Sequence, residues 1–162
     1  MFAALRAVSG VKKMARARSY RELIVWQKSM KLARAAYQLT NSLPKKEAYG
    51  LVSQLRRAAV SVPSNIAEGH GRLTDLQFRH FLGNARGSLY ELQTQIELAG
   101  DLGFLDPASV TEFMEQGSEV ARLINGLITS MREIKRPAPG AITPLTARSA
   151  ANSPSSADKE LH

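Results

Sequence analysis

The sequence contains no cysteine, which excludes disulfides, thiolate metal sites and cysteine nucleophiles. This absence fits the cytoplasm, where thiols stay reduced, and we expect a cytoplasmic protein. The three histidines are His70, His80 and His162, and none has a carboxylate or a second histidine at the paired spacing of a carboxylate-bridged metal bundle. We therefore predict no metal site and no cofactor.

Long apolar runs and catalytic patterns are also missing. No stretch approaches the roughly 20 apolar residues that cross a bilayer, so we predict no membrane contact. Glu68 and His70 are close in sequence, but a glutamate at a helix end beside a turn histidine is ordinary, and no nucleophile stands at a fitting spacing. The stretch GHGR at 69–72 follows a helix and lacks the strand and the lysine of a P-loop. We predict a protein that is not an enzyme.

The net charge of +8 is unevenly distributed over the 162 residues, a length typical of one domain. Residues 1–18 carry five basic and no acidic side chains, residues 19–90 carry eleven basic and four acidic ones, and residues 91–136 carry four basic and eight acidic ones. A basic half joined to an acidic half can bind a polyanion or pair head to tail with copies of itself. Composition leaves both interpretations open.

The two ends of the chain lack the pattern of the middle. Residues 1–18 form a basic leader, which we interpret as a disordered arm or as an over-extended start with Met14 as the initiator, with a transit peptide as the alternative. Residues 137–162 are rich in Ser and Pro and lack hydrophobic periodicity, so we predict a disordered tail. The folded domain should span 19–136.

Four helical segments are predicted within 19–136, each from its own start signal. A capping box of Ser19 and Glu22 opens the first, which runs to about residue 42. Pro44 suits the first turn of the second, which ends before Gly69. A capping box at 74 and 77 opens the third, which reaches about residue 102, and an Asp-Pro pair at 106–107 opens the fourth, which reaches about residue 136.

Apolar residues alternate three and four apart along each segment. The predicted core positions are Leu23, Trp26, Met30, Ala33, Tyr37 and Thr40; Ala48, Val52, Leu55, Ala59, Val62 and Ile66; Phe78, Leu82, Ala85, Leu89, Leu92, Ile96 and Ala99; and Val110, Met114, Gly117, Ala121, Ile124, Ile128 and Met131. Four such patterns joined by short turns predict an all-α, antiparallel up-and-down four-helix bundle.

A second apolar set lies about a third of a turn away on the first and fourth segments. Its members are Val25, Leu32, Ala36, Leu39 and Leu43, and Phe113, Val120, Leu123, Leu127 and Ile134. This set belongs either to a wide core or to an interface between subunits. Pro63 should kink the second helix, and the pair Gly83 and Gly87 suggests a close helix approach.

Arginines are the strongest candidates for binding nucleic acid or a partner. Arg56 and Arg57 are adjacent, and Arg72, Arg79 and Arg86 recur every seven residues. Exposed positive charge can neutralise phosphates without reading sequence. Lys28, Lys31 and Arg34 form another basic group, which we interpret as a solvated face.

Two stretches carry a family resemblance: residues 25–72 read VWQKSMKLARAAYQLTNSLPKKEAYGLVSQLRRAAVSVPSNIAEGHGR, and residues 81–106 read FLGNARGSLYELQTQIELAGDLGFLD. Over about residues 19–133 the chain resembles the bacterial 23S rRNA intervening-sequence proteins, also called the four-helix bundle protein family. The resemblance implies a bundle that assembles into a homopentamer. Related accessory proteins of diversity-generating retroelements imply partners such as ribosomal or other structured RNA, a reverse transcriptase or another nucleoprotein.

The positions that match the family motif are Gln54, Arg56, Arg57, Asn65, Glu68, Gly69 and Arg72, with Pro63 before NIAEG. These residues have either a structural role or a direct contact with RNA or a protein. In the structural role, Asn65 and Glu68 cap or bridge helix ends, and Arg57 pairs with Glu68 across the kink or between subunits. Two functional hypotheses follow. One is an oligomeric module associated with RNA or a nucleoprotein; the other is a purely structural assembly protein or adaptor that binds no nucleic acid.

Overall fold

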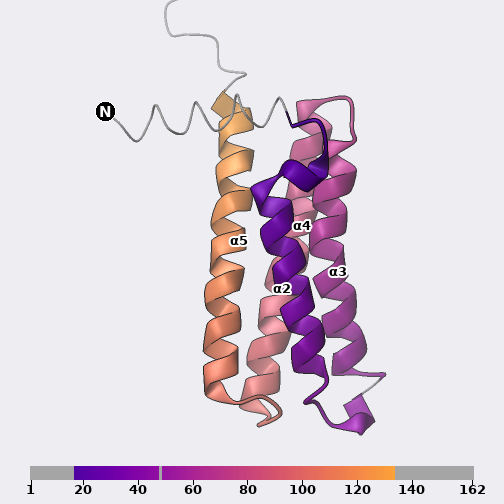
Figure 1. Ribbon diagram of the computed structural model, residues 1–162, viewed down its shortest axis with the longest axis vertical. Coiled ribbons are helices and arrows are strands. Elements are labelled where there is room, and N and C mark those ends of the chain that lie inside the picture. The colour runs from indigo at the N-terminus through magenta and orange to yellow at the C-terminus, as the bar shows by residue number, and fades with distance from the viewer. Residues whose placement is uncertain (1–16, 48, 134–162) are drawn as a thin grey trace, which may run out of the picture.

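The computed structural model describes residues 17–47 and 49–133, so the predicted leader, apart from residues 17 and 18, and the predicted tail lie outside the described part. Figure 1 shows four long helices side by side: α2 (Ile24–Thr40), α3 (Leu51–His70), α4 (Asp75–Asp101) and α5 (Pro107–Glu133). Two short 3-10 turns, η1 (Tyr20–Glu22) and η2 (Lys45–Glu47), precede α2 and α3. No strand occurs in the described residues, which confirms the predicted all-α bundle.

The helices form a square in cross-section. Each packs against its neighbours in the sequence, and α5 closes on α2, whereas in the described residues no Cα atom of α2 lies within 8 Å of a Cα atom of α4 and none of α3 lies within 8 Å of one of α5. The α2–α3 pair and the α4–α5 pair are therefore opposite sides of the bundle. None of the helices in 17–47 and 49–133 is both long and apolar enough to cross a lipid bilayer.

The core is built mainly from leucine, alanine, valine and isoleucine. Its fully inaccessible side chains include Leu55, Ile66, Leu82, Leu89, Leu92, Ile96 and Ile124. The patterns predicted for α3 and α4 match this core, apart from Ala48, which lies outside the described residues, and Phe78, which is only partly buried. Apolar burial of this kind contributes about 1.5–3 kcal/mol for each large side chain.

On α2 and α5 most of the second apolar set is buried together with part of the first set, so it belongs to a wide core; Ile134 lies outside the described residues. Val25, Leu32, Phe113 and Val120 are each at most 2% exposed. Helix α2 packs against both α3 and α5, so its buried side faces the space between these two helices. This buried side is rotated about the helix axis relative to the predicted one. Three predicted core residues, Trp26, Met30 and Tyr37, instead lie partly or largely exposed on the α3 side of α2.

The first helix start differs from the prediction. Ser19 accepts a hydrogen bond from the Arg21 amide (3.3 Å) and so caps η1, while Glu22 accepts from the Arg18 amide (3.2 Å) and does not close a capping box. Leu23 is extended and buried, and it separates η1 from α2. Anchoring this side chain in the core interrupts the helix.

The second helix begins at Leu51 and not at Pro44, which corrects the predicted start. The Pro44 carbonyl instead accepts from the Glu47 amide (2.9 Å) within η2. Gly50 has φ −98° and ψ −114°, a non-helical conformation that separates η2 from α3. Glu47 nevertheless accepts from the Leu51 amide (3.4 Å), so its carboxylate satisfies one donor at the start of α3.

The predicted cap residues of α4 and α5 are confirmed. Thr74 accepts from the Gln77 amide (3.2 Å) at the start of α4. The Gln77 Oε1, however, accepts from the Thr74 hydroxyl (3.2 Å) and not from its amide, so the predicted capping box is only half formed. At the end of α4, the Gly103 amide donates to the Gly100 carbonyl (2.8 Å) and the Phe104 amide to the Ala99 carbonyl (2.9 Å), with Gly103 at φ +71°. This is a Schellman motif, whose left-handed residue favours glycine.

Asp106 caps α5 as predicted. Its carboxylate accepts from the amide and the hydroxyl of Ser109, at 2.9 and 2.6 Å. These two hydrogen bonds lower the pKa of the Asp106 carboxyl below its ordinary value, because they stabilise the ionised form. Pro107 then occupies the first helical position, where its missing amide hydrogen leaves no donor unpaired.

Glycine-mediated helix approach occurs at other positions than predicted. A Cβ at Gly83 or Gly87 would meet nothing within 4 Å, so these residues do not bring helices together inside this chain. A Cβ at Gly69 would lie 2.6 Å from the Phe81 Cβ, and one at Gly100 would lie 2.9 Å from the Val110 side chain. The close approaches thus join α3 to α4 and α4 to α5.

Candidate interaction site

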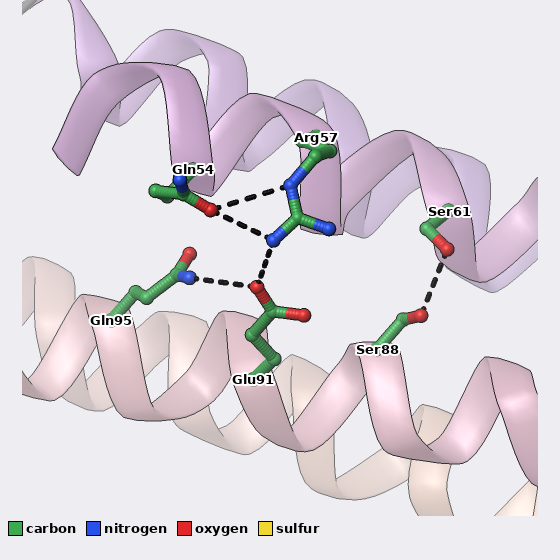
Figure 2. A network of polar contacts seen from close by, with 6 residues as sticks. All are labelled: Gln54, Arg57, Ser61, Ser88, Glu91 and Gln95. Atoms are coloured by element: carbon green, nitrogen blue, oxygen red, sulfur yellow. Dashed lines mark hydrogen bonds and ion pairs between the residues drawn. The ribbon is translucent and has the colours of Figure 1, made fainter. Parts of the chain in front are cut away.

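A polar seam joins α3 and α4 around Arg57, as Figure 2 shows. The Arg57 Nη2 donates to Gln54 Oε1 (2.7 Å) and pairs with Glu91 Oε1 (2.5 Å). The Nε2 of Gln95 donates to the same Glu91 oxygen (3.2 Å), and the Gln95 Oε1 is buried without a hydrogen-bond partner in the described residues. Arg57 and Gln54, two of the motif residues, therefore bind the chain itself.

Two serines continue this seam along the same two helices, as Figure 2 shows, and Asn65 binds one of them. The hydroxyls of Ser61 and Ser88 lie 2.8 Å apart across the α3–α4 interface. Asn65 Nδ2 donates to the Ser61 carbonyl (2.9 Å) and to the Ser61 hydroxyl (3.1 Å). The motif residue Asn65 thus supports the packing of α3 on α4 and does not cap a helix end.

Glu68 pairs with Arg72 and not with Arg57, so the predicted pairing across the kink within one chain was wrong, while the alternative pairing between subunits stays a prediction. Arg57 and Glu68 are eleven residues apart on one helix, about 16 Å along its axis, which is beyond the reach of the two side chains. The Arg72 guanidinium carbon also lies 4.8 Å from the centre of the Phe81 ring. Arg72 is therefore held at the turn between α3 and α4.

The other motif residues of α3 lie in the core. Gly69 is buried against Phe78 and Phe81 of α4. Pro63 is also buried, and α3 continues past it to His70, so the proline is accommodated within the helix. The predicted kink at Pro63 stays a prediction.

The remaining predicted arginines are dispersed. Arg56 Nε donates to the buried Thr40 hydroxyl (3.0 Å), and its guanidinium carbon lies 5.1 Å from the centre of the Tyr37 ring. Arg86 Nη1 donates to Asn125 Oδ1 (3.0 Å), which joins α4 to α5. Arg79 is partly buried on α4 and makes no ion pair in the described part of the chain. The five predicted residues do not gather on one face.

Basic residues of α2 and η2 are more accessible. Lys31 and Arg34 are exposed on α2, and Lys45 and Lys46 are exposed on η2; none forms an ion pair with another described residue. Lys28 differs, since its Nζ lies 2.9 Å from Glu119 of α5. We call the set Lys31, Lys45 and Lys46 the basic strip, and we leave Arg34 out of it because this side chain also lines a groove between α2 and α3.

An apolar groove of about 630 Å³ runs between α2 and α3. Its α2 wall includes Trp26, Met30 and Tyr37, and its α3 wall includes Val60 and Pro63. The Tyr37 and Val60 side chains are 42% and 46% exposed. We call this feature the α2–α3 groove.

His70 and His80, the two histidines in the described part of the chain, each pack against a different phenylalanine. His70 packs edge-on against Phe78, with ring centres 6.1 Å apart, and His80 packs against Phe81 at 5.8 Å. No group of three His, Asp or Glu side chains in the described ranges is arranged to hold a metal ion.

Comparison with known proteins places the chain in a family. A family model described as 23S rRNA-intervening sequence protein matches residues 21–126, more than half of the chain. The chain belongs to this family. A crystal structure of a protein of unknown function from the S23 ribosomal protein family of Bacteroides thetaiotaomicron is similar, with a TM-score of 0.61 and 20% identity over 65% of this chain and 98% of that one. At this identity the likeness shows the fold alone, and no curated protein matches the chain.

In this 23S rRNA intervening sequence protein, the α2–α3 groove was missed by sequence reasoning. Periodicity assigned Trp26, Met30 and Tyr37 to the core because they alternate three and four apart. The signal that could have separated the two apolar sets of α2 is size. The set that packs inside contains small and branched residues, whereas the groove set contains Trp, Tyr and Met, which are enriched at interfaces.

Proposed function

We propose that this 23S rRNA intervening sequence protein is a non-enzymatic, homo-oligomeric module of the cytoplasm that associates with RNA or a nucleoprotein through basic surfaces. A pentamer is the assembly that the family resemblance implies. The basic strip is the surface that we assign to RNA. The predicted arginines Arg72 and Arg79 are secondary contacts at the other end of α3 and the start of α4.

The observation that carries this proposal is the accessibility of positive charge on α2. This helix contains three basic residues and no acidic one. Two of these basic residues are exposed without an ion pair among the described residues, and η2 adds Lys45 and Lys46. By contrast, the ion pairs of Arg57 and Arg72 already neutralise part of their charge within the chain.

Such a strip suits phosphates rather than base edges. Lysine and arginine on a helix surface neutralise phosphates and release counterions, so that binding weakens steeply with salt and depends little on sequence. The strip consists of cationic side chains, so we assign it to the nucleic-acid backbone rather than to the bases.

The test is a fluorescence anisotropy titration with a structured RNA at several salt concentrations. The triple variant Lys31→Gln, Lys45→Gln and Lys46→Gln should bind weaker, and its logarithmic salt slope should fall in magnitude by roughly 2–3, because three phosphate contacts are lost. The matched control is Lys28→Gln, Arg57→Gln and Arg86→Gln, which removes the same charge from side chains already engaged with Glu119, Glu91 and Asn125 of this chain and should change the slope less. Equal losses in both triple variants, or no RNA binding at low salt, would overturn the proposal.

A second candidate is structural assembly without nucleic acid, and the α2–α3 groove favours it. A large apolar groove on a surface is typical of protein contacts. If RNA binding is absent while sedimentation shows an oligomer, this second function replaces the first.

A further inference from the structure

The α2–α3 groove combines a wide apolar floor with aromatic walls that are already partly covered. Arg56 lies over the Tyr37 ring, with its guanidinium carbon 5.1 Å from the ring centre. Tyr20 packs edge-on against Trp26, with ring centres 5.1 Å apart and planes at 67°. Nucleobases need a free aromatic face on which to stack. The groove therefore suits apolar side chains of a protein better than bases.

On the opposite side of the bundle lies a second hollow, whose charged lining is mainly acidic. Between α4 and α5, a hollow of about 670 Å³ has Val110 and Met114 among its apolar residues and Glu97 and Glu115 among its charged ones. Arg122 is the basic side chain among the residues that line it.

An exposed aromatic residue lies on the same side of α4 as this hollow. Tyr90 is 49% exposed and precedes Glu97 by seven residues, about two helical turns. We call this surface, with the hollow, the α4–α5 face. Its apolar centre and acidic side chains complement a basic partner surface with an apolar floor.

We propose that the α2–α3 groove is covered by the α4–α5 face of a second copy of this chain. This inference rests on the homo-oligomer in the proposed function and names the two surfaces that form it. Arg34 lines the groove, and Arg56 lies beside it on Tyr37, opposite in sign to Glu97 and Glu115.

The two surfaces differ and lie on opposite sides, so the contact is heterologous. Each copy uses its groove on one neighbour and its α4–α5 face on another, and such a contact repeats around a ring or along a chain. A two-fold symmetric dimer, in which one patch meets itself, does not follow from this arrangement.

Trp26 provides a direct probe, because it is the one tryptophan of the sequence and lines the groove. On dilution of the wild-type protein, its emission should shift to longer wavelength as the groove becomes exposed to water. Val60→Glu places a charge in the groove at a 46% exposed helical position, and it should weaken assembly about tenfold or more in sedimentation experiments. Leu73→Glu, at a position 99% exposed, is the matched control and should assemble as wild type.

A mixing experiment tests which surfaces meet. Val60→Glu leaves the α4–α5 face intact, and the double variant Glu97→Arg with Glu115→Arg leaves the groove apolar. Each should fail to assemble alone, and a mixture should form a one-to-one complex. Circular dichroism confirms that the variants are folded. Failure of the mixture to form this complex, with both variants folded, would overturn the heterologous contact.

Other outcomes separate this inference from the proposed function. A wild-type protein that stays monomeric at high micromolar concentration would refute the homo-oligomer itself. An oligomer that Val60→Glu leaves intact would refute the groove as its interface and leave the homo-oligomer standing. Loss of RNA binding by Val60→Glu with assembly retained would reassign the groove to nucleic acid.

Discussion

Gly69 of α3 lies against Phe81 of α4 so closely that a Cβ at position 69 would be 2.6 Å from the Phe81 Cβ. The same added atom would be 2.8 Å from the Phe78 ring. The Phe81 contact is with a Cβ, which is fixed to the backbone, so relief requires α3 and α4 to separate. This glycine sets the distance between the two helices near the turn that joins them.

Gly69→Ala should therefore destabilise the protein although alanine is the better helix former. The clash should cost about 1–3 kcal/mol, as overpacking does, and should exceed the roughly 1 kcal/mol gained from helix propensity. Gly87→Ala is the matched control, since its Cβ would meet nothing within 4 Å, and it should stabilise by up to about 1 kcal/mol. Urea unfolding measures both. A stabilised Gly69→Ala would contradict the close approach.

The Arg57–Glu91 ion pair should contribute little by itself. The side chains are 63% and 38% exposed, so water screens the attraction. A double-mutant cycle with Arg57→Ala and Glu91→Ala should give a coupling energy of about 0.2–1 kcal/mol that falls as salt rises. Thermal unfolding at low and high salt provides the measurement. A coupling above about 2 kcal/mol, independent of salt, would show that the polar seam acts as a buried network.

Truncating a core side chain of α4 that periodicity predicted should lower the free energy of unfolding much more than breaking the Arg57–Glu91 ion pair. Leu89 is fully buried, and Leu89→Ala should cost about 2–5 kcal/mol through lost apolar contact and the cavity left behind. Leu73→Ala at the exposed turn should change the free energy of unfolding by less than about 0.5 kcal/mol. Equal effects at the two positions in urea unfolding would refute the assigned core.

Sequence patterns predicted which segments form helices better than they predicted which side of each helix is buried. The patterns of α3 and α4 identified the buried side correctly because one apolar stripe stands out on each. Helix α2 has two apolar stripes, and a repeat of three and four fits both, so periodicity could not decide between Leu32 and Met30. The choice depends on where α3 and α5 lie, which is tertiary information.

The candidate site was harder to predict because charge alone does not reveal pairing. The adjacent arginines at 56 and 57 look like a binding pair in the sequence. In the fold, Arg56 faces α2 and Arg57 faces α4, because successive helical residues point about 100° apart. Partners such as Thr40 and Glu91 are distant in sequence, so these contacts appear only when the helices are packed.

Because the Asp106 carboxylate caps α5, part of the free energy of unfolding should depend on pH. The pKa of Asp106 is lowered in the folded protein by the hydrogen bonds from Ser109, relative to the ordinary value of 3.8. A carboxyl with a lowered folded pKa stabilises the fold above its unfolded pKa, and this contribution is lost as pH falls through 3.8 towards the folded pKa.

Asp106→Asn keeps an oxygen that can accept the Ser109 amide but cannot titrate. The difference in melting temperature between wild type and Asp106→Asn should therefore be largest near neutral pH and should shrink below pH 3.8. Asp106→Ala should lose the cap at every pH, which tests the cap itself. A wild-type advantage over Asp106→Asn that stays constant from neutral to acidic pH would show that the charge of Asp106 does not stabilise α5.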